Sequence, residues 1–210
     1  MSCRRCFFPL LFTLLATVGF AHAQPCTAIS LDGSGTPESP FLIATADDLL
    51  TLTTELNHQD TSLEAACWSA HYEVTNDIDL GIQGFAASGG VNMQCNPLAG
   101  QTTFSGTFDG GGHVIANGYL NASGTGCEGL FTMVRGATFQ DLTFSGVDAS
   151  LDMGYTAFTG MVAGGAAEST FRNVHVKGGD VYGTVAGGLV GVAYTSDASR
   201  ALRFENVGYD

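Results

Sequence analysis

Two short apolar elements recur together in the carboxyl-terminal half of this 210-residue chain. The first is Gly-Leu-Phe at 129–131, which returns as Gly-Met-Val at 160–162 and Gly-Leu-Val at 188–190. The second begins at Phe139, Phe171 and Phe204, so its copies lie 32 and then 33 residues apart. A unit of this length with no helical pattern cannot bury its apolar face alone, and the units must therefore stack. The repeat predicts a mainly β fold, a solenoid of stacked β coils.

Stacked coils place like residues about 4.8 Å apart, so each repeated position becomes a column. The three leading phenylalanines should form an aromatic stack. Two inward aliphatic or mixed columns should follow it, and the first element should supply a further set of apolar positions. These sets are Leu142, Val174 and Val207; Phe144, Val176 and Tyr209; and Leu130, Met161 and Leu189.

One polar position interrupts the second element in each copy, as Asp141, Asn173 and Asn206. Asn and Asp tolerate left-handed backbone and bond to neighbouring main chain, so these residues suit a corner of the coil. We expect Asn173 and Asn206 to form a short amide ladder. The alternative is a row of ligand-binding side chains.

Composition limits the class of protein. Apolar residues make up 45% of the chain, which disfavours disorder, and 29 glycines without a three-residue period exclude collagen. The formal net charge is −13, and a surface this acidic repels phosphate backbones, so we expect no nucleic acid partner. The length is enough for one domain with a core.

The first 23 residues have the pattern of a cleaved secretory signal. Arg4 and Arg5 precede an apolar run from Phe7 to Phe20, and Ala-His-Ala at 21–23 is a small-x-small cleavage pattern. A membrane anchor is the alternative, but the run is about 14 residues where a span needs about 20. We expect an exported protein, secreted or on the cell surface, that begins at Gln24.

Four cysteines remain after such cleavage: Cys26, Cys67, Cys95 and Cys127. An even number in an exported chain favours disulfides over metal thiolates. We expect Cys26–Cys67 across a capping helix and Cys95–Cys127 between coils, because the latter pair is one repeat apart. Cys67 and Cys95, 28 residues apart, satisfy the same argument, so the connectivity stays open.

The amino-terminal part differs from the repeats. A short entry strand is expected at 40–43. Thr45 followed by Asp48, with Leu49, Leu52 and Leu56 at helical spacing, predicts a capped amphipathic helix over 45–57, the only convincing helix in the chain. Alternating apolar residues over 72–80 predict a strand. We divide the mature chain into a cap at 24–60 and coils at 61–210.

Several of these motifs resemble a known family. Gly-Leu-Phe at 129–131 and Gly-Gly-Leu-Val-Gly at 187–191 look like the GLUG motif of bacterial surface proteins. Stretches upstream resemble the amino-terminal part of such repeat proteins, and they lie at 33–43, 76–80 and 104–115. The segment from 84 to 101 departs from the family pattern, because it lacks the usual Trp-x-Pro-Ile-Gly run.

The resemblance implies a right-handed parallel β-helix of the pectin-lyase-like kind, with the helix at 45–57 as its amino-terminal cap. Family members occur in adhesins, in large cell-surface proteins and in the non-catalytic part of IgA-specific metallo-endopeptidases. The motifs specify an architecture and leave the activity open.

Pectin-lyase-like helices also include lyases and glycosidases, so we weighed the acidic residues one by one. Asp77 and Asp79, two apart on a strand, suit calcium binding or acid–base chemistry, or a turn before a strand. Asp109, followed by three glycines and His113, has the residue types of a sugar-cleaving site or of a turn. The basic side chains that such sites use to grip uronate are missing, because the five Arg and Lys residues of the mature chain are scattered. We expect no catalytic residues, metal or cofactor.

The preferred function is therefore a non-catalytic adhesin-like or scaffold segment, as a fragment of a larger surface protein, with an extracellular glycan or protein as ligand. A polysaccharide-active enzyme is the alternative, which an open groove with convergent carboxylates and an Arg or Lys would favour. The copy at 204–209 ends in core-type residues with no capping unit after it. We expect it to self-associate or to continue into a longer chain.

Overall fold

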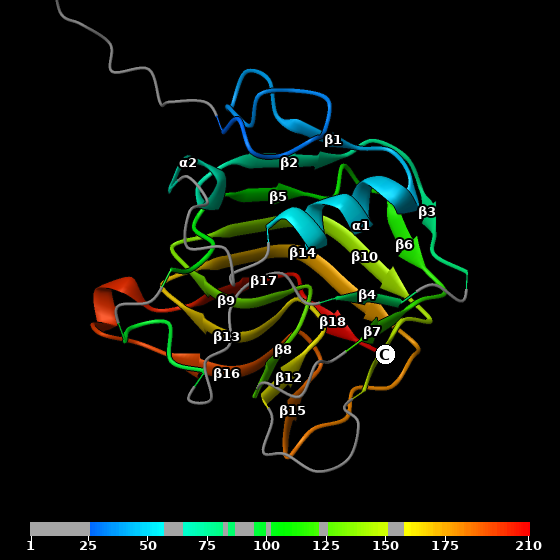
Figure 1. Ribbon diagram of the computed structural model, residues 1–210. Coiled ribbons are helices and arrows are strands. Elements are labelled where there is room, and N and C mark those ends of the chain that lie inside the picture. The colour runs from blue at the N-terminus through cyan, green and yellow to red at the C-terminus, as the bar shows by residue number, and fades with distance from the viewer. Residues whose placement is uncertain are drawn as a thin grey trace, which may run out of the picture.

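The computed structural model describes residues 26–56, 65–81, 84–86, 95–99, 102–121, 126–150 and 158–210. The expected signal at 1–23 lies outside the described residues. Strands stack into parallel layers around a common axis, with the helix α1 (Ala46–Glu55) beside them (Figure 1). The expected β-helix fold is confirmed.

A nine-stranded parallel sheet forms the largest wall of the solenoid. Its strands follow the axis in the order β1 (Phe41–Ile43), β2 (His71–Val74), β5 (Thr107–Asp109), β10 (Thr138–Ser145), β14 (Thr170–Lys177) and β17 (Arg203–Glu205). Beyond a bend in the same wall lie β3 (Ile78–Asp79), β6 (Val114–Ala116) and β18 (Gly208–Tyr209). The expected continuous strand over 72–80 is instead two strands with this bend between them.

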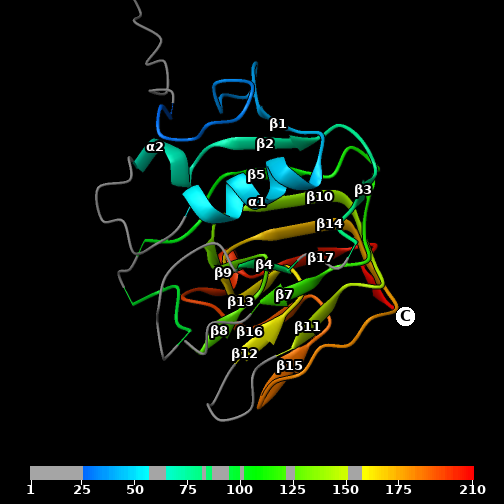
Figure 2. The same cartoon turned by 45° about the vertical axis from the view of Figure 1, so that its right-hand side comes forward.

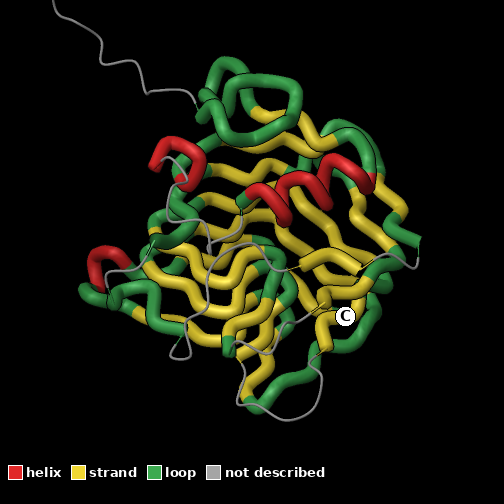
Figure 3. Tube along the Cα trace, viewed as in Figure 1, coloured by secondary structure: helices red, strands yellow, loops and turns green. Residues whose placement is uncertain are grey.

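Three smaller parallel sheets complete the coils, as the turned view and the tube trace show (Figures 2 and 3). One contains β4 (Gly84–Ala86), β7 (Tyr119–Asn121) and β11 (Asp148–Ser150). The second contains β8 (Cys127–Glu128), β12 (Phe158–Gly160) and β15 (Val185–Gly187). The third contains β9 (Phe131–Arg135), β13 (Ala163–Ala167) and β16 (Val190–Tyr194).

The GLUG-like glycines lie where the second and third of these sheets meet. An added Cβ at Gly191 would come within 2.7 Å of the backbone of Gly164, Phe158 and Thr159. At Gly160 the same atom would lie 2.5 Å from the Gly191 nitrogen. Only glycine permits backbones to approach this closely. Gly160 and Gly191 are thus explained by packing between β12, β13 and β16, whereas an added Cβ at Gly188 would meet the Tyr209 side chain.

Register along the main wall follows the repeat. Phe139 pairs with Phe171, and Phe171 pairs with Phe204, in parallel register. The rings stack with centroids 5.2 Å apart at both steps. The column continues upward through residues that the repeat alone did not identify: Phe108, Tyr72 and Phe41. One aromatic column therefore runs through every layer of the wall.

Helix α1 begins and ends close to the expected 45–57. Thr45 is its N-cap, and the capping box is complete because the Asp48 side chain accepts from the Thr45 backbone at 2.9 Å. Leu49, Leu52 and Leu56 are buried. The expectation of a single helix is wrong, since a four-residue helix α2 (Ala65–Trp68) and a 3-10 turn η1 (Ala198–Arg200) are also present. Both are too short to leave a periodic sequence signal.

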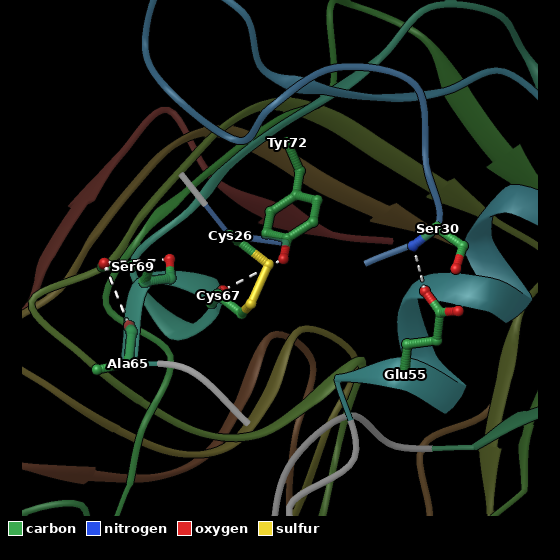
Figure 4. Close-up of a disulfide and its surroundings, with 8 residues drawn as sticks. Cys26, Ser30, Glu55, Ala65, Cys67, Ser69 and Tyr72 are labelled. Atoms are coloured by element: carbon green, nitrogen blue, oxygen red, sulfur yellow. Dashed lines mark hydrogen bonds between the residues drawn. A yellow bond between two sulfur atoms is a disulfide. The ribbon is translucent and has the colours of Figure 1, made fainter. Parts of the chain in front are cut away.

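Two disulfides join the four cysteines. Cys26 is bonded to Cys67 with Cα atoms 4.7 Å apart, and Cys95 to Cys127 with Cα atoms 5.4 Å apart. Figure 4 shows the first of these beside Tyr72, whose hydroxyl donates to the Cys67 carbonyl at 3.2 Å. Burial, followed by the charge of Glu55, raises the pKa of the Tyr72 hydroxyl. The alternative pairing of Cys67 with Cys95 is wrong.

The carboxyl-terminal coil keeps its register but not its burial. Phe139 and Phe171 are fully buried, whereas Phe204 and Tyr209 are each 47% exposed. Val207 is partly buried against the core. Phe204 and Tyr209 take the expected column positions, and their exposure fits the expectation that no capping unit covers this coil, because no described residue lies beneath them.

Candidate functional site: the outer face of the main wall

Side chains on the outer face of the main wall form two polar columns. Thr107, Thr138 and Thr170 are register neighbours in one of them. The second column passes through five strands, β2, β5, β10, β14 and β17, and contains Glu73, Asp109, Gln140, Arg172 and Glu205. Apart from Asp109, sequence analysis missed both columns. Both columns could have been found from the sequence, because side chains alternate between the two faces of a strand. The residues before and after each inward phenylalanine must therefore point outward.

Hydrogen bonds connect the second column from coil to coil. The Gln140 side-chain amide donates to Asp109 Oδ2 and accepts at Oε1 from Arg172 Nη2 at 2.7 Å. The other oxygen of Asp109 accepts from the Gly111 backbone at 2.9 Å, which is the geometry of an Asp turn. Asp109 is thus held by both of its oxygens, and the expectation of a turn at Asp109 fits this arrangement.

A shallow groove of about 220 Å³ crosses the upper end of these columns. Its lining combines two prolines, one histidine and two carboxylates with neutral polar groups: Pro37, Pro40, His71, Tyr72, Glu73, Thr107, Asp109 and Gln140. None of these residues is Lys or Arg. The groove thus has the carboxylates of a sugar-cleaving site without the cation that grips a uronate.

Asp77 lies at the bend between β2 and β3 and Asp79 lies in β3, and each accepts hydrogen bonds from the next coil. Asp77 Oδ1 accepts from the Val114 backbone at 3.0 Å and lies 3.2 Å from His113 Nδ1. These hydrogen bonds, that of Val114 first, lower the pKa of the Asp77 carboxyl. Asp77 therefore ties two coils together, and His113 is engaged with Asp77.

Asp79 has the same role two residues later. Its Oδ1 accepts from the Gly81 backbone at 2.9 Å and from Asn117 Nδ2 at 3.1 Å. Both bonds lower the pKa of the Asp79 carboxyl, that of Gly81 more. The carboxylates that suited calcium binding or acid–base work are thus hydrogen-bond acceptors of the coil edges.

The three polar corner residues lie above one another. Asp141, Asn173 and Asn206 have φ angles of 50°, 53° and 51°, in the left-handed region that Asn and Asp tolerate. Asn173 Nδ2 donates to Asp141 Oδ1 at 2.6 Å, and Asn206 Nδ2 donates to Asn173 Oδ1 at 2.9 Å. The ladder is one residue longer than the expected amide pair. Its bonds within the wall favour the corner over the ligand row.

Sequence analysis missed a second charged corner. Glu168, with a φ of 53°, accepts from Arg135 Nε at 3.0 Å and from the Ser196 hydroxyl, and Arg200 lies 3.9 Å away. The Ser196 bond, then the Arg135 bond, lowers the pKa of the Glu168 carboxyl. Gly136, 32 residues earlier with a φ of 72°, marks the same corner one coil above. The corner was not predicted at 168 because glutamate, unlike the glycine at 136, is not a residue typical of turns.

No group of three or more His, Cys, Asp or Glu side chains converges on a metal site within the described ranges. In the same part of the chain, no helix is long and apolar enough to cross a membrane. The two disulfides fit a chain that folds in an oxidising compartment.

Comparison with known proteins gives one similarity. The chain is 31% identical over 179 residues to halomucin of Haloquadratum walsbyi (strain DSM 16790 / HBSQ001). The match covers 81% of this chain but spans about 2% of the length of halomucin. No family model matches the chain, and no solved structure matches it.

Proposed function

We propose that this chain is an exported, non-catalytic β-helix, a scaffold or adhesin-like segment of a bacterial surface protein of the GLUG type. The observation that carries the proposal is that its acidic side chains are engaged in hydrogen bonds within the fold. Asp77, Asp79 and Asp109 each accept hydrogen bonds that fix a turn or join two coils. Carboxylates held in this way stabilise the fold and are not free to act on a substrate.

The similarity to halomucin supports a role as one part of a much longer protein. The matched region is about 2% of that protein but most of this chain. A solenoid suits such a role, because each coil contacts only its neighbours and the structure extends by adding coils. The resemblance to GLUG-type surface proteins points the same way.

The groove lining contains no Lys or Arg, which supports a non-catalytic role over a polysaccharide-active enzyme. A uronate-cleaving groove needs a base and a cation at the sugar. The groove lining includes His71, Glu73 and Asp109 but no Lys or Arg. Arg172, the basic residue further along the column of Asp109 and Gln140, donates to Gln140.

The test is incubation of the exported chain with polygalacturonate, alginate and xylan, with and without calcium. We expect no reducing ends and no unsaturated product above a blank. The variants Glu73→Gln and Asp109→Asn are assayed beside it. A product that appears with the unaltered chain and disappears in both variants would overturn the proposal and establish an enzyme.

The same groove favours a second candidate, binding of an extracellular glycan. Pro37 and Pro40 offer apolar faces, and His71, Glu73 and Gln140 offer polar groups of the kind that bind hydroxyls. Glycan-array binding followed by calorimetry tests this. We expect His71→Ala and Glu73→Gln to abolish binding and the control His175→Ala, on the neighbouring part of the wall, to retain it. Equal binding by all four proteins would reject the groove as the site.

A further inference from the structure

The last coil exposes apolar side chains that the coils above it bury. Four of the six large exposed hydrophobic residues of the described chain lie here, with Tyr182 59%, Val185 41%, Phe204 47% and Tyr209 47% exposed. The other two, Leu42 and Tyr119, lie in β1 and β7. Phe204 lies directly below Phe171, with ring centroids 5.2 Å apart. Its second face has no ring beneath it among the described residues. This end of the solenoid is therefore an apolar surface of defined geometry.

The edge strand β17 also presents backbone groups. The Arg203 N–H donates to the Ser169 carbonyl at 3.0 Å, toward the coil above. Successive residues of a strand direct their backbone groups to opposite edges, so the N–H and C=O of Phe204 face the open side. A single residue with both groups outward is the centre of an antiparallel hydrogen-bonded pair, in which two residues exchange both bonds.

We propose that this edge pairs with the same edge of a second copy of the chain, antiparallel and about a two-fold axis at Phe204. Phe204 of each copy then exchanges both backbone bonds with Phe204 of the other. The main wall continues from one copy into the next, and the aromatic column becomes continuous through the dimer. An isologous contact of this kind closes on itself and leaves no open edge.

Charges on β17 complement each other in this arrangement. Arg203 and Glu205 flank Phe204 on the outer face and are exposed. An antiparallel pair centred on Phe204 sets Arg203 of one copy opposite Glu205 of the second copy, twice over. Opposite charges directly across a strand pair stabilise it and like charges destabilise it.

The distribution of charge along the chain also favours this end. Residues 24–134 contain 12 Asp and Glu and no Lys or Arg, a charge of −12, whereas residues 135–210 contain 8 and 5, a charge of −3. Contact between the carboxyl-terminal coils therefore brings together the least acidic parts of two acidic molecules.

Head-to-tail stacking is disfavoured by the opposite end. The β1 edge is covered there, because the Leu42 N–H donates to the Asp32 carbonyl at 2.8 Å. The chain at 26–40 folds over β1 above the wall (Figure 1). Within the described residues, β1 is therefore not a free edge strand for a second copy.

Sedimentation of the exported chain at tens of micromolar tests the proposal with charge reversals. We expect a dimer whose dissociation constant rises at least about tenfold in R203E and in E205R, since each variant sets like charges opposite one another. An equimolar mixture of R203E and E205R should form a heterodimer, and the double variant R203E/E205R should recover the dimer. Lys177→Glu, the same change of charge one coil above, should leave it intact.

Three results would overturn the proposal. One is a monomer at every concentration. Another is a dimer that neither single reversal weakens. The third is the growth of larger assemblies, which requires head-to-tail contact.

Discussion

The two ends of this solenoid carry the same strand pattern and differ in what lies over it. At the amino-terminal end, Phe41 and Ile43 of β1 are 1% and 0% exposed. At the carboxyl-terminal end, Phe204 lies in the same column as Phe41 but is 47% exposed, and Tyr209 is also 47% exposed. At the first end the chain at 26–40 folds over β1 (Figure 1), and the Cys26–Cys67 disulfide joins this segment to α2. The repeat sets where a residue lies, and only a covering segment buries it.

Because of this difference, the contribution of a side chain to the free energy of unfolding should depend on its position in the column. A residue in the middle touches a like residue above and below, whereas an end residue touches one. Substitutions along one column should therefore have graded effects, which distinguishes a solenoid with one open end from one that is closed at both.

The largest expected effect comes from the aromatic column. Phe139→Ala removes a ring that is fully buried and stacks on Phe171, so it should lower the free energy of unfolding by about 3–5 kcal/mol. Phe204→Ala, at the open end, should cost less than half of that when measured on the monomer at submicromolar concentration. Urea unfolding of both variants gives the two values. Equal losses would contradict an open carboxyl-terminal end.

Removal of the capping disulfide should come next. The double variant Cys26→Ala/Cys67→Ala should lose about 2–4 kcal/mol, because a cross-link over 41 residues no longer restricts the unfolded chain. Thermal unfolding checks this, with the Cys95→Ala/Cys127→Ala variant as the matched comparison at a separation of 32. Loss of protection confined to β1 and β2 in the first variant would sharpen the comparison. An unchanged melting temperature would show that the cap does not depend on its disulfide.

The corner ladder offers a smaller contrast between the same two regions. Asn173 bonds to the residues above and below it at a φ of 53°, so Asn173→Ala should cost about 1–3 kcal/mol in strain and lost bonds. Asn206→Ala loses one bond and should cost less. Asn173→Gly relieves the strain but not the bond loss, and should fall between wild type and Asn173→Ala in urea unfolding. A larger loss for Asn206→Ala than for Asn173→Ala would count against the ladder.

Acid should produce the smallest effect. Hydrogen bonds lower the carboxyl pKa of Asp77, Asp79 and Glu168 in the folded state. Their contribution to stability is thus present above the ordinary carboxyl pKa of about 4 and is lost as pH falls through the lower folded values. We expect the melting temperature of Asp77→Asn to depend less on pH between 6 and 3 than that of the unaltered chain. Identical slopes would show that Asp77 is not a coil-to-coil acceptor.

Much of the main wall could be predicted because its side chains repeat at the coil length. The phenylalanine column, the left-handed corner at Asn173 and the one-repeat spacing of Cys95 and Cys127 are all consequences of stacking. The continuation of the column through Phe41 and Tyr72 could not be recognised, because the coils there differ in length and the aromatic residues lie in unlike motifs.

The candidate groove could not be predicted for a related reason. His71 and Glu73 come from one coil, Asp109 from the next and Gln140 from a third, and only the parallel register brings them together. The loop that adds Pro37 and Pro40 to the groove belongs to the cap, outside the repeat.

Amide hydrogen exchange at Phe204 tests the central comparison most directly. The account predicts that the Phe204 amide is protected at tens of micromolar, where two edges pair, and exchanges freely at nanomolar concentration. The Phe139 and Phe171 amides, inside the wall, should be protected equally at both concentrations. Protection of Phe204 that does not change with concentration would contradict an open edge completed by a second copy.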